Sequence, residues 1–232
     1  MKEYLKEEYL KQNMMGPNAI ILIDELIKDL DISQSERILD LGCGTGLTSM
    51  FLADRFPALV FAMDLWIPAS ENFARFAALG LDKRIIPIHA DANSETFADE
   101  YFDAVISVDS YHYYGNNEAY LDNHLAPLIK KDGIIALCFP GLKKELDYLP
   151  EEMALSWPKE ALDTLHSCDW WRDILSQSKM VDIVSISEMS CFEKSWNDWL
   201  SCDNPYAVSD RPAMEAGAGK YMNLISVICR KK

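Results

Sequence analysis

The chain has 232 residues, 49% of them hydrophobic and 25% charged, and its formal net charge at pH 7 is −15. This length and composition are those of one globular α/β domain with elaborations, which can bury a full core without metals or disulfides. Nucleic acids and anionic membranes are bound through basic clusters, and the densest one here is Arg230-Lys231-Lys232. The charge therefore argues against both partners and favours a small neutral or cationic substrate.

The sequence pattern carries no sign of membrane insertion or secretion. No window approaches the roughly 18 to 20 consecutive apolar residues that a membrane helix needs, and the first ten residues carry five charges. We expect a cytoplasmic protein without stable membrane association, and a homodimer is compatible with the sequence. No two cysteines have CxxC spacing, so we expect reduced thiols and no metal site. The cysteines are Cys43, Cys138, Cys168, Cys191, Cys202 and Cys229.

Taken in chain order, helical and apolar segments alternate. A helical stretch ends at Gly16-Pro17 and a second helix is predicted at 18–29. The next apolar runs are continuous rather than alternating, which is typical of strands in a parallel sheet covered by helices on both faces. The alternation predicts a doubly wound α/β fold. The predicted strands are 37–41, 59–63, 84–88, 102–108 and 133–139, and the predicted helices between them are 47–55, 69–78 and 117–128.

The last third of the chain is less regular. A helix is predicted near 169–178, a strand near 181–187 and a final strand at 223–229. The segments 140–167 and 189–222 are long for loops in a compact domain, which favours a functional cap. These two segments hold Trp157, Trp196 and Trp199.

The most informative segment is ILDLGCGTGL, residues 38–47, in which a strand leads directly into three glycines at alternate positions. Glycines allow a tight turn and close approach of the backbone to a ligand, and the following helix offers free N–H groups. Asp40, just before the turn, would repel a pyrophosphate but could accept a hydrogen bond from an ammonium group. This acid and the GxGxG spacing disfavour a dinucleotide-dependent dehydrogenase.

LDLGCGTG closely resembles the first motif of class I S-adenosylmethionine (SAM)-dependent methyltransferases, and further motifs of that family follow in order. They are VFAMDLW at the second strand, HADAN, FDAVISVDSYHYYG and KKDGIIAL, so the resemblance covers residues 14–139 and the last strand. Within the family the chain looks most like small-molecule enzymes of the ubiquinone/menaquinone, phosphoethanolamine and cyclopropane-synthase type.

The resemblance implies a Rossmann-like seven-stranded sheet with a reversed last strand and helical, aromatic cap insertions. It implies SAM as cofactor and methyl transfer to N, O or S of a small-molecule metabolite. The alternatives are a lipid or quinone headgroup methyltransferase and a catalytically silent SAM-binding sensor or partner protein. We divide the single domain, residues 1–232, into N-terminal helices with a lid (1–35), a SAM-binding core (36–139) and the cap insertions (140–167 and 189–222).

By the same resemblance, Asp64 binds both ribose hydroxyls, and Asp91 with the Ala92 backbone contacts the adenine. For either acid the alternative is a carboxylate that caps the next helix, and for the glycines it is a purely structural turn. The residues expected to bind the cofactor are Asp40, Gly42, Cys43, Gly44, Gly46, Asp64, Leu65, Asp91, Ala92 and Asp109.

The candidate catalytic residues are His112 and Tyr111, in the aromatic run after the fourth strand, at the edge where open α/β sheets bind ligands. A histidine can take a proton from an amine, hydroxyl or thiol that attacks the methyl group. Asp109 could orient His112 or the amino group of SAM. The alternative for His112 is packing or gating, because a neutral nucleophile needs no base. His89 is expected to be structural.

Three further hypotheses concern the roof of the site. In the resembled enzymes the stretch matching residues 9–17 folds over the methionyl end of SAM, so we expect a lid hinged near Met14, Met15 and Gly16; the alternative is a solvated helix. We expect the two cap segments to complete the roof. Their aromatic residues could cage a cationic amine or simply pack. Cys168, Cys191 and Cys202 could bind an arsenite-like metalloid or act as small hydrophobes.

Overall fold

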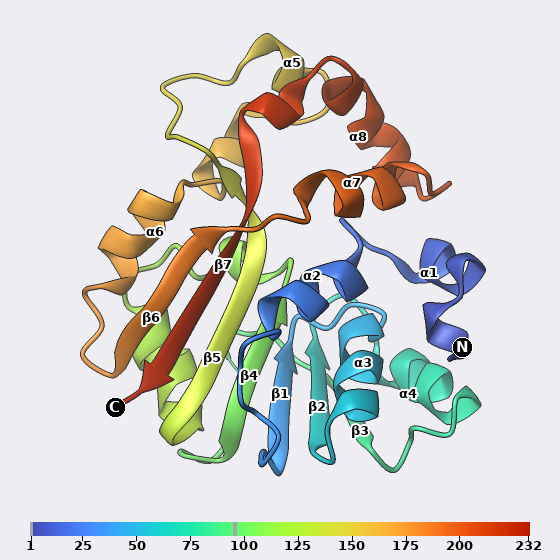
Figure 1. Cartoon of the computed structure of the whole chain (residues 1–232), viewed down its shortest axis with the longest axis vertical. Coiled ribbons are helices and arrows are strands. Elements are labelled where there is room, and N and C mark those ends of the chain that lie inside the picture. Colours follow the sequence, from blue (N-terminus) through green and yellow to red (C-terminus); the bar gives the residue numbers. More distant parts are fainter. Residues whose placement is uncertain (1, 95–96) are drawn as a thin grey trace.

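The computed structural model describes residues 2–94 and 97–232. They form a seven-stranded sheet with strand order β3-β2-β1-β4-β5-β7-β6 (Figure 1). The first five strands pair in parallel, and β7 runs antiparallel to both β5 and β6. The predicted Rossmann-like sheet with a reversed last strand is therefore confirmed. The strands are β1 (Arg37–Leu41), β2 (Leu59–Asp64), β3 (Ile85–His89), β4 (Phe102–Val108), β5 (Ile129–Leu142), β6 (Val181–Glu188) and β7 (Met222–Lys231).

Successive side chains of a strand point to opposite faces, so each central strand feeds two cores. Ile38 of β1 packs into one core, together with buried residues of α2 (Ala19–Leu26), α3 (Leu47–Arg55) and α4 (Ala69–Ala78). Leu39, the next residue, packs into the other core with α6 (Cys168–Leu175). This two-sided burial explains why the strands read as continuous apolar runs.

Side-chain caps fix where several helices begin. Asn18 accepts a hydrogen bond from the Ile20 N–H at the start of α2, and Ser167 accepts one from the Trp170 N–H at the start of α6. α8 (Pro205–Glu215) begins with a proline at its first position behind the cap residue Asn204. Within the described residues, no helix has the length and apolar character that spanning a bilayer requires.

The structure differs from the predicted elements at 117–128. The helix expected at 117–128 is reduced to one π-helical turn, Leu121–Leu125, and a short 3₁₀ turn that contains Pro127, which lacks an N–H for a regular helix. The cap segments hold α5 (Glu151–Ala154), α7 (Phe192–Leu200) and α8, which Figure 1 shows beyond the carboxyl ends of the central strands. α1 (Glu7–Asn13) lies on the same side of the molecule, near α3.

Candidate cofactor-binding and active site

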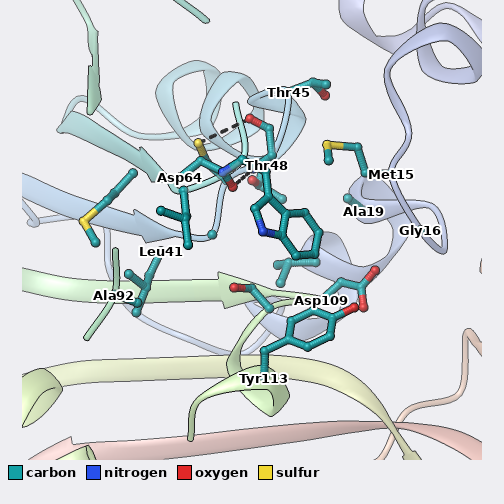
Figure 2. Close-up of a pocket in the computed structure, with 18 of the residues that line it drawn as sticks. Met15, Gly16, Ala19, Leu41, Thr45, Thr48, Asp64, Ala92, Asp109 and Tyr113 are labelled. Carbon is teal, nitrogen blue, oxygen red and sulfur yellow. Dashed lines mark hydrogen bonds between the residues drawn. The ribbon is translucent and has the colours of Figure 1, made fainter. Parts of the chain in front are cut away.

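A cavity of about 320 Å³ opens at the carboxyl ends of β1 to β4. Figure 2 shows Asp64 and Ala92 on one side of it and Met15 and Gly16 on the other. Its lining residues fall within the stretches 13–19, 41–48, 63–66, 90–93 and 108–114.

Eight of the twelve predicted site residues line this cavity. They are Gly42, Cys43, Gly44, Asp64, Leu65, Asp91, Ala92 and Asp109. Four are not among its lining residues, namely Asp40, Gly46, Tyr111 and His112.

The glycine turn after β1 requires glycine on backbone grounds. Gly42, Gly44 and Gly46 have φ angles of 75°, 54° and 86°, in the left-handed region that other residues rarely adopt. A Cβ on Gly42 would lie 1.9 Å from the Ser110 Oγ, and one on Gly46 would lie 2.4 Å from the Phe76 ring. Gly46 thus allows α4 to pack against the turn, while Gly42 and Gly44 bring the backbone to the cavity wall.

Asp64 ends β2 with its carboxylate held by backbone donors. Its Oδ2 accepts a hydrogen bond from the Gly44 N–H at 2.8 Å, and its Oδ1 accepts from Trp66 and Ile67 at 2.7 and 2.9 Å. The alternative role of Asp64 was to cap the next helix. Asp64 caps only the turn at 65–67, because the residue that precedes α4 is Pro68. A carboxylate has about four lone-pair sites, so Asp64, 8% exposed at the cavity, keeps acceptor capacity for a ligand hydroxyl.

Asp40 lies beneath the glycine turn rather than at the cavity. Its Oδ2 accepts hydrogen bonds from Thr48 at 2.6 Å and Ser49 at 2.5 Å, and its Oδ1 has no partner within the described part of the chain. Burial raises the pKa of this carboxyl to about 6. In this arrangement Asp40 ties β1 to the start of α3, and it is Thr48 that reaches the cavity.

The end of β3 supplies Asp91. Its Oδ1 accepts hydrogen bonds from the backbone and side-chain N–H groups of Asn93, at 2.9 and 3.0 Å, and these lower the pKa of the Asp91 carboxyl. Tyr120 donates to the Ala92 carbonyl at 2.9 Å and so fixes the following loop. His89 contacts the Leu65 carbonyl through Nε2 at 2.8 Å and is not a lining residue.

Asp109 follows β4 in the left-handed conformation, with φ 57°, and lines the cavity. Its carboxylate faces the N-terminal segment so closely that a Cβ on Gly16 would lie 2.0 Å from Oδ2. Burial, with a smaller contribution from the negative charge of Asp210, raises the pKa of Asp109 to about 8. Asp210 belongs to α8, and its two oxygens accept hydrogen bonds from the indoles of Trp157 and Trp199, both at 2.9 Å.

We expect Asp109→Asn to stabilise the protein in a pH-dependent way. The pKa of Asp109 rises from 3.8 to about 8 on folding, so between these values the folded state holds a proton that the unfolded chain has lost. Stability therefore falls as pH rises through this window, and asparagine, which also tolerates a left-handed φ, removes the effect. The melting temperature of the variant should match that of the wild type at pH 4 and exceed it by at least about 4 °C at pH 8. Asp147→Asn, at an exposed position, is the control; an equal gain at both pH values would contradict the prediction.

The candidate catalytic residues His112 and Tyr111 are 3% and 0% exposed. Burial lowers the pKa of His112 to about 3, and its Nδ1 has no hydrogen-bond partner among the described residues. The Tyr111 ring packs against Phe139 and Trp171. Of the aromatic run, Tyr113 and Tyr114 are the residues that face the cavity.

Tyr113 and Trp66 are not among the site residues predicted from the sequence. Their rings lie 5.7 Å apart and are largely exposed, 54% for Tyr113 and 66% for Trp66. Both line the cavity, as do Thr48 and Ser110. Their positions in the sequence could have indicated them, since Trp66 follows the strand-end acid Asp64 and Tyr113 follows β4.

The N-terminal segment forms part of the cavity wall through Asn13, Met15 and Gly16. Thr45 donates a hydrogen bond to the Asn13 carbonyl at 2.6 Å, which joins this segment to the glycine turn. From the cap, Asn204 donates to the Met14 carbonyl at 3.3 Å. The segment is thus held between the turn and the cap.

The two cap segments contribute none of the lining residues that the structure describes. Their part in the predicted roof is indirect, because they hold the N-terminal segment. Trp157 and Trp196 pack edge to face at 6.2 Å, and Trp199 is 1% exposed. These tryptophans therefore pack in the cap and do not form a cage for an amine. Across residues 2–94 and 97–232, no three or more Cys, His or acidic residues gather as a metal-binding group would, and Cys168, Cys191 and Cys202 are all free thiols.

Residues 38–133 match the family model described as a methyltransferase domain. Among curated proteins, phosphoethanolamine N-methyltransferase 1 of Arabidopsis thaliana is 25% identical over 104 residues, which cover 45% of this chain and 21% of that protein. The match thus spans about a fifth of the length of this curated relative.

Several solved structures share the fold over most of the chain, among them two methyltransferases. Haemonchus contortus phosphoethanolamine N-methyltransferase 2, in complex with phosphomonomethylethanolamine and S-adenosylhomocysteine, aligns with a TM-score of 0.74 at 16% identity, covering 99% of this chain and 58% of that chain. Geranyl diphosphate C-methyltransferase from Streptomyces coelicolor A3(2), in complex with S-adenosylhomocysteine, aligns with a TM-score of 0.70 at 14% identity, covering 92% and 76%.

The fold and the cavity at its carboxyl edge define the class of Rossmann-like methyltransferases. With the family match, they confirm the resemblance to class I, small-molecule SAM-dependent methyltransferases. Residues 38–133 match a methyltransferase domain, and the described chain has the fold of SAM-dependent methyltransferases.

Proposed function

We propose that this protein transfers the methyl group of SAM to nitrogen, oxygen or sulfur of a small-molecule metabolite. The observation that carries the proposal is the placement of the glycine turn, Asp64 and Asp91 around one cavity at the ends of three adjacent strands. The names of the relatives, which include phosphoethanolamine N-methyltransferases, support a small acceptor.

The polar groups of the cavity fit SAM. Asp64 and Asp91 supply carboxylate oxygens for the ribose hydroxyls and the adenine amino group, and the backbone of the glycine turn lines the cavity beside Asp64. SAM, when bound, supplies a methyl carbon activated by its sulfonium. The chain's own contribution is to orient the two reactants and to keep water out, the latter through the N-terminal segment at residues 13–17.

The charge of the cavity favours a neutral or cationic acceptor. None of its described lining residues is Lys, Arg or His, whereas Asp64 and Asp91 are acidic. A phosphate-bearing group would find no cation in this wall. The exposed faces of Trp66 and Tyr113 offer aromatic surface beside Asp109, which suits an amine or a flat neutral molecule.

A lipid or quinone headgroup is the second candidate acceptor. One observation favours it: the cap exposes four large apolar side chains, with exposed fractions between 46% and 76%. They are Tyr148, Leu155, Tyr206 and Val208. A catalytically silent SAM-binding protein would share the same cofactor cavity, so only turnover separates it from an enzyme.

We expect SAM and S-adenosylhomocysteine (SAH) to bind with low-micromolar affinity and NAD not to bind. A dinucleotide pyrophosphate would meet carboxylates and no basic side chain in this cavity. Calorimetric titration measures the dissociation constant of each of the three ligands. Binding of NAD without binding of SAM would contradict the proposal.

Incubation with methyl-labelled SAM and a cell extract then identifies the acceptor. Label in water-soluble metabolites supports the proposal, label in the lipid fraction supports the second candidate, and binding without any transfer supports the silent protein.

A further inference from the structure

Asn72, on α4, lies directly behind the glycine turn and is 1% exposed. Its Nδ2 donates a hydrogen bond to the Gly44 carbonyl at 2.8 Å and lies 3.7 Å from the Cys43 sulfur. It is not a lining residue of the cavity. Asn72 therefore touches the part of the turn that faces away from the cofactor.

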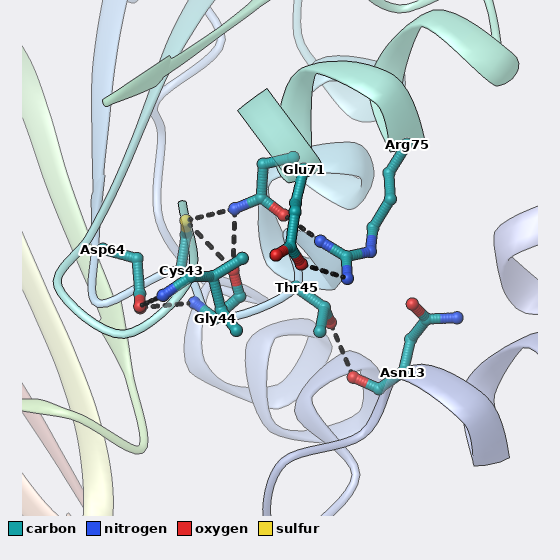
Figure 3. Close-up of polar contacts among 9 residues, drawn as sticks. Asn13, Cys43, Gly44, Thr45, Asp64, Glu71 and Arg75 are labelled. Atoms are coloured by element: carbon teal, nitrogen blue, oxygen red, sulfur yellow. Dashed lines mark hydrogen bonds and ion pairs between the residues drawn. The ribbon is translucent and has the colours of Figure 1, made fainter. Parts of the chain in front are cut away.

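The neighbouring side chains fix which way this amide points. Arg75, one turn later on α4, donates to the Asn72 Oδ1 at 2.9 Å and pairs with Glu71 at 3.4 Å. Figure 3 shows Glu71 and Arg75 on one side of the glycine turn and Asp64 on the other. A guanidinium can only donate hydrogen bonds, so the amide oxygen of Asn72 must face Arg75 and its NH₂ must face Gly44.

The Gly44 carbonyl belongs to the peptide that joins Gly44 to Thr45. The described chain has no cis peptide bond, and in a trans peptide the C=O and N–H point in opposite directions. With the carbonyl turned toward Asn72, the Thr45 N–H points away from α4. Thr45 lines the cavity, and its N–H finds no acceptor among the hydrogen bonds of the described residues.

Asp64 fixes the preceding peptide by accepting from the Gly44 N–H. Both peptides that flank Gly44 are thus oriented by side chains, one from β2 and one from α4. Gly44 has the left-handed φ of 54°, and the Gly46 N–H also fixes the first of these peptides by donating to the Cys43 carbonyl at 2.9 Å, so Asn72 is the contact that fixes the second.

We propose that Asn72 is a positioning residue that directs the Thr45 N–H at the carboxylate of the cofactor's methionyl end. This inference rests on the proposed binding of SAM. The carboxylate needs donors, and the described cavity wall has no Lys, Arg or His to provide them. A free, pre-oriented backbone N–H fills that role, as oriented N–H groups at turns do for anions elsewhere.

The test compares two neutral thioethers that differ in the amino-acid moiety, SAH and 5′-methylthioadenosine. Asn72→Ala removes the donor to Gly44, and Asn72→Asp replaces it with an oxygen that would face the Gly44 carbonyl. In both variants the dissociation constant of SAH should rise by about tenfold or more, as expected for a hydrogen bond to a charged group. That of 5′-methylthioadenosine, which has no carboxylate, should change by less than about twofold.

Asn116→Asp is the matched control, because the Asn116 amide also donates to a backbone carbonyl, that of Asp163, away from the cavity. It should leave both dissociation constants unchanged. If a thermal melt shows that a variant at position 72 is unfolded, Arg75→Met tests the same idea. It removes the donor to the Asn72 Oδ1, so the amide of Asn72 is no longer held in one orientation. Equal weakening of the two ligands, or no weakening of either, would overturn the positioning role. Failure of the wild type to bind SAH at all would instead overturn the proposed cofactor.

Discussion

Asp64→Ala is expected to weaken the binding of SAM and SAH by at least about 100-fold, which corresponds to the loss of roughly 3 kcal/mol from hydrogen bonds to a charged acceptor. The Asp64 carboxylate accepts from three backbone N–H groups, those of Gly44, Trp66 and Ile67, and is the acid proposed to hold the ribose. Its removal takes away the ribose acceptor and also the side-chain hydrogen bond from the Gly44 N–H, although the Gly42 and Cys43 N–H groups still donate to the Met63 carbonyl of β2. Isothermal titration of the variant and the wild type measures the loss.

Asp64→Asn and Asp31→Ala sharpen this experiment. Asparagine keeps the shape and one acceptor oxygen, so its loss should be smaller than that of alanine. Asp31 is exposed and, among the described residues, accepts hydrogen bonds only from Ser33, so Asp31→Ala should bind as the wild type does. An unchanged dissociation constant in Asp64→Ala would show that Asp64 does not hold the ribose and serves only to cap the turn at 65–67.

His112→Ala is expected to slow methyl transfer by about 100-fold while leaving SAM binding nearly intact. His112 is buried, burial lowers its pKa to about 3, and its ring lies 4.0 Å from that of Tyr113, which lines the cavity. A group with so low a pKa is a poor base near neutral pH, since proton transfer is most efficient when the pKa is close to the working pH. We therefore propose that His112 acts by orienting the Tyr113 ring.

His112→Phe separates the two roles, because it keeps an aromatic ring and removes the nitrogen atoms. We expect this variant to retain most of the turnover and the pH–rate profile of the wild type to show no inflection from His112 between pH 5 and 9. If His112→Phe is as slow as His112→Ala, the nitrogen is needed and His112 is the base. If both variants lose SAM binding, His112 shapes the cofactor cavity instead.

The sequence alone predicted the strand-helix alternation and the cofactor end of the site. Both depend on local pattern: continuous apolar runs read as buried parallel strands, and the carboxyl ends of adjacent parallel strands share one edge. That is why Asp64 and Asp91, 27 positions apart in the sequence, line one cavity as expected. The left-handed φ angles of Gly42, Gly44 and Gly46 also follow from the local sequence, because glycine adopts them readily.

Which side chains of a motif face the cavity was decided only by the tertiary structure. Residues next to each other on a short turn point in different directions, so His112 is buried while Tyr113 reaches the ligand side. Asp40 is drawn beneath the turn by the hydroxyls of Thr48 and Ser49. Asn72 has no motif around it, because its contact with Gly44 exists only when α4 packs over Gly46. Sequence period and strand order determine where a site forms, whereas packing between distant elements determines which atoms it presents.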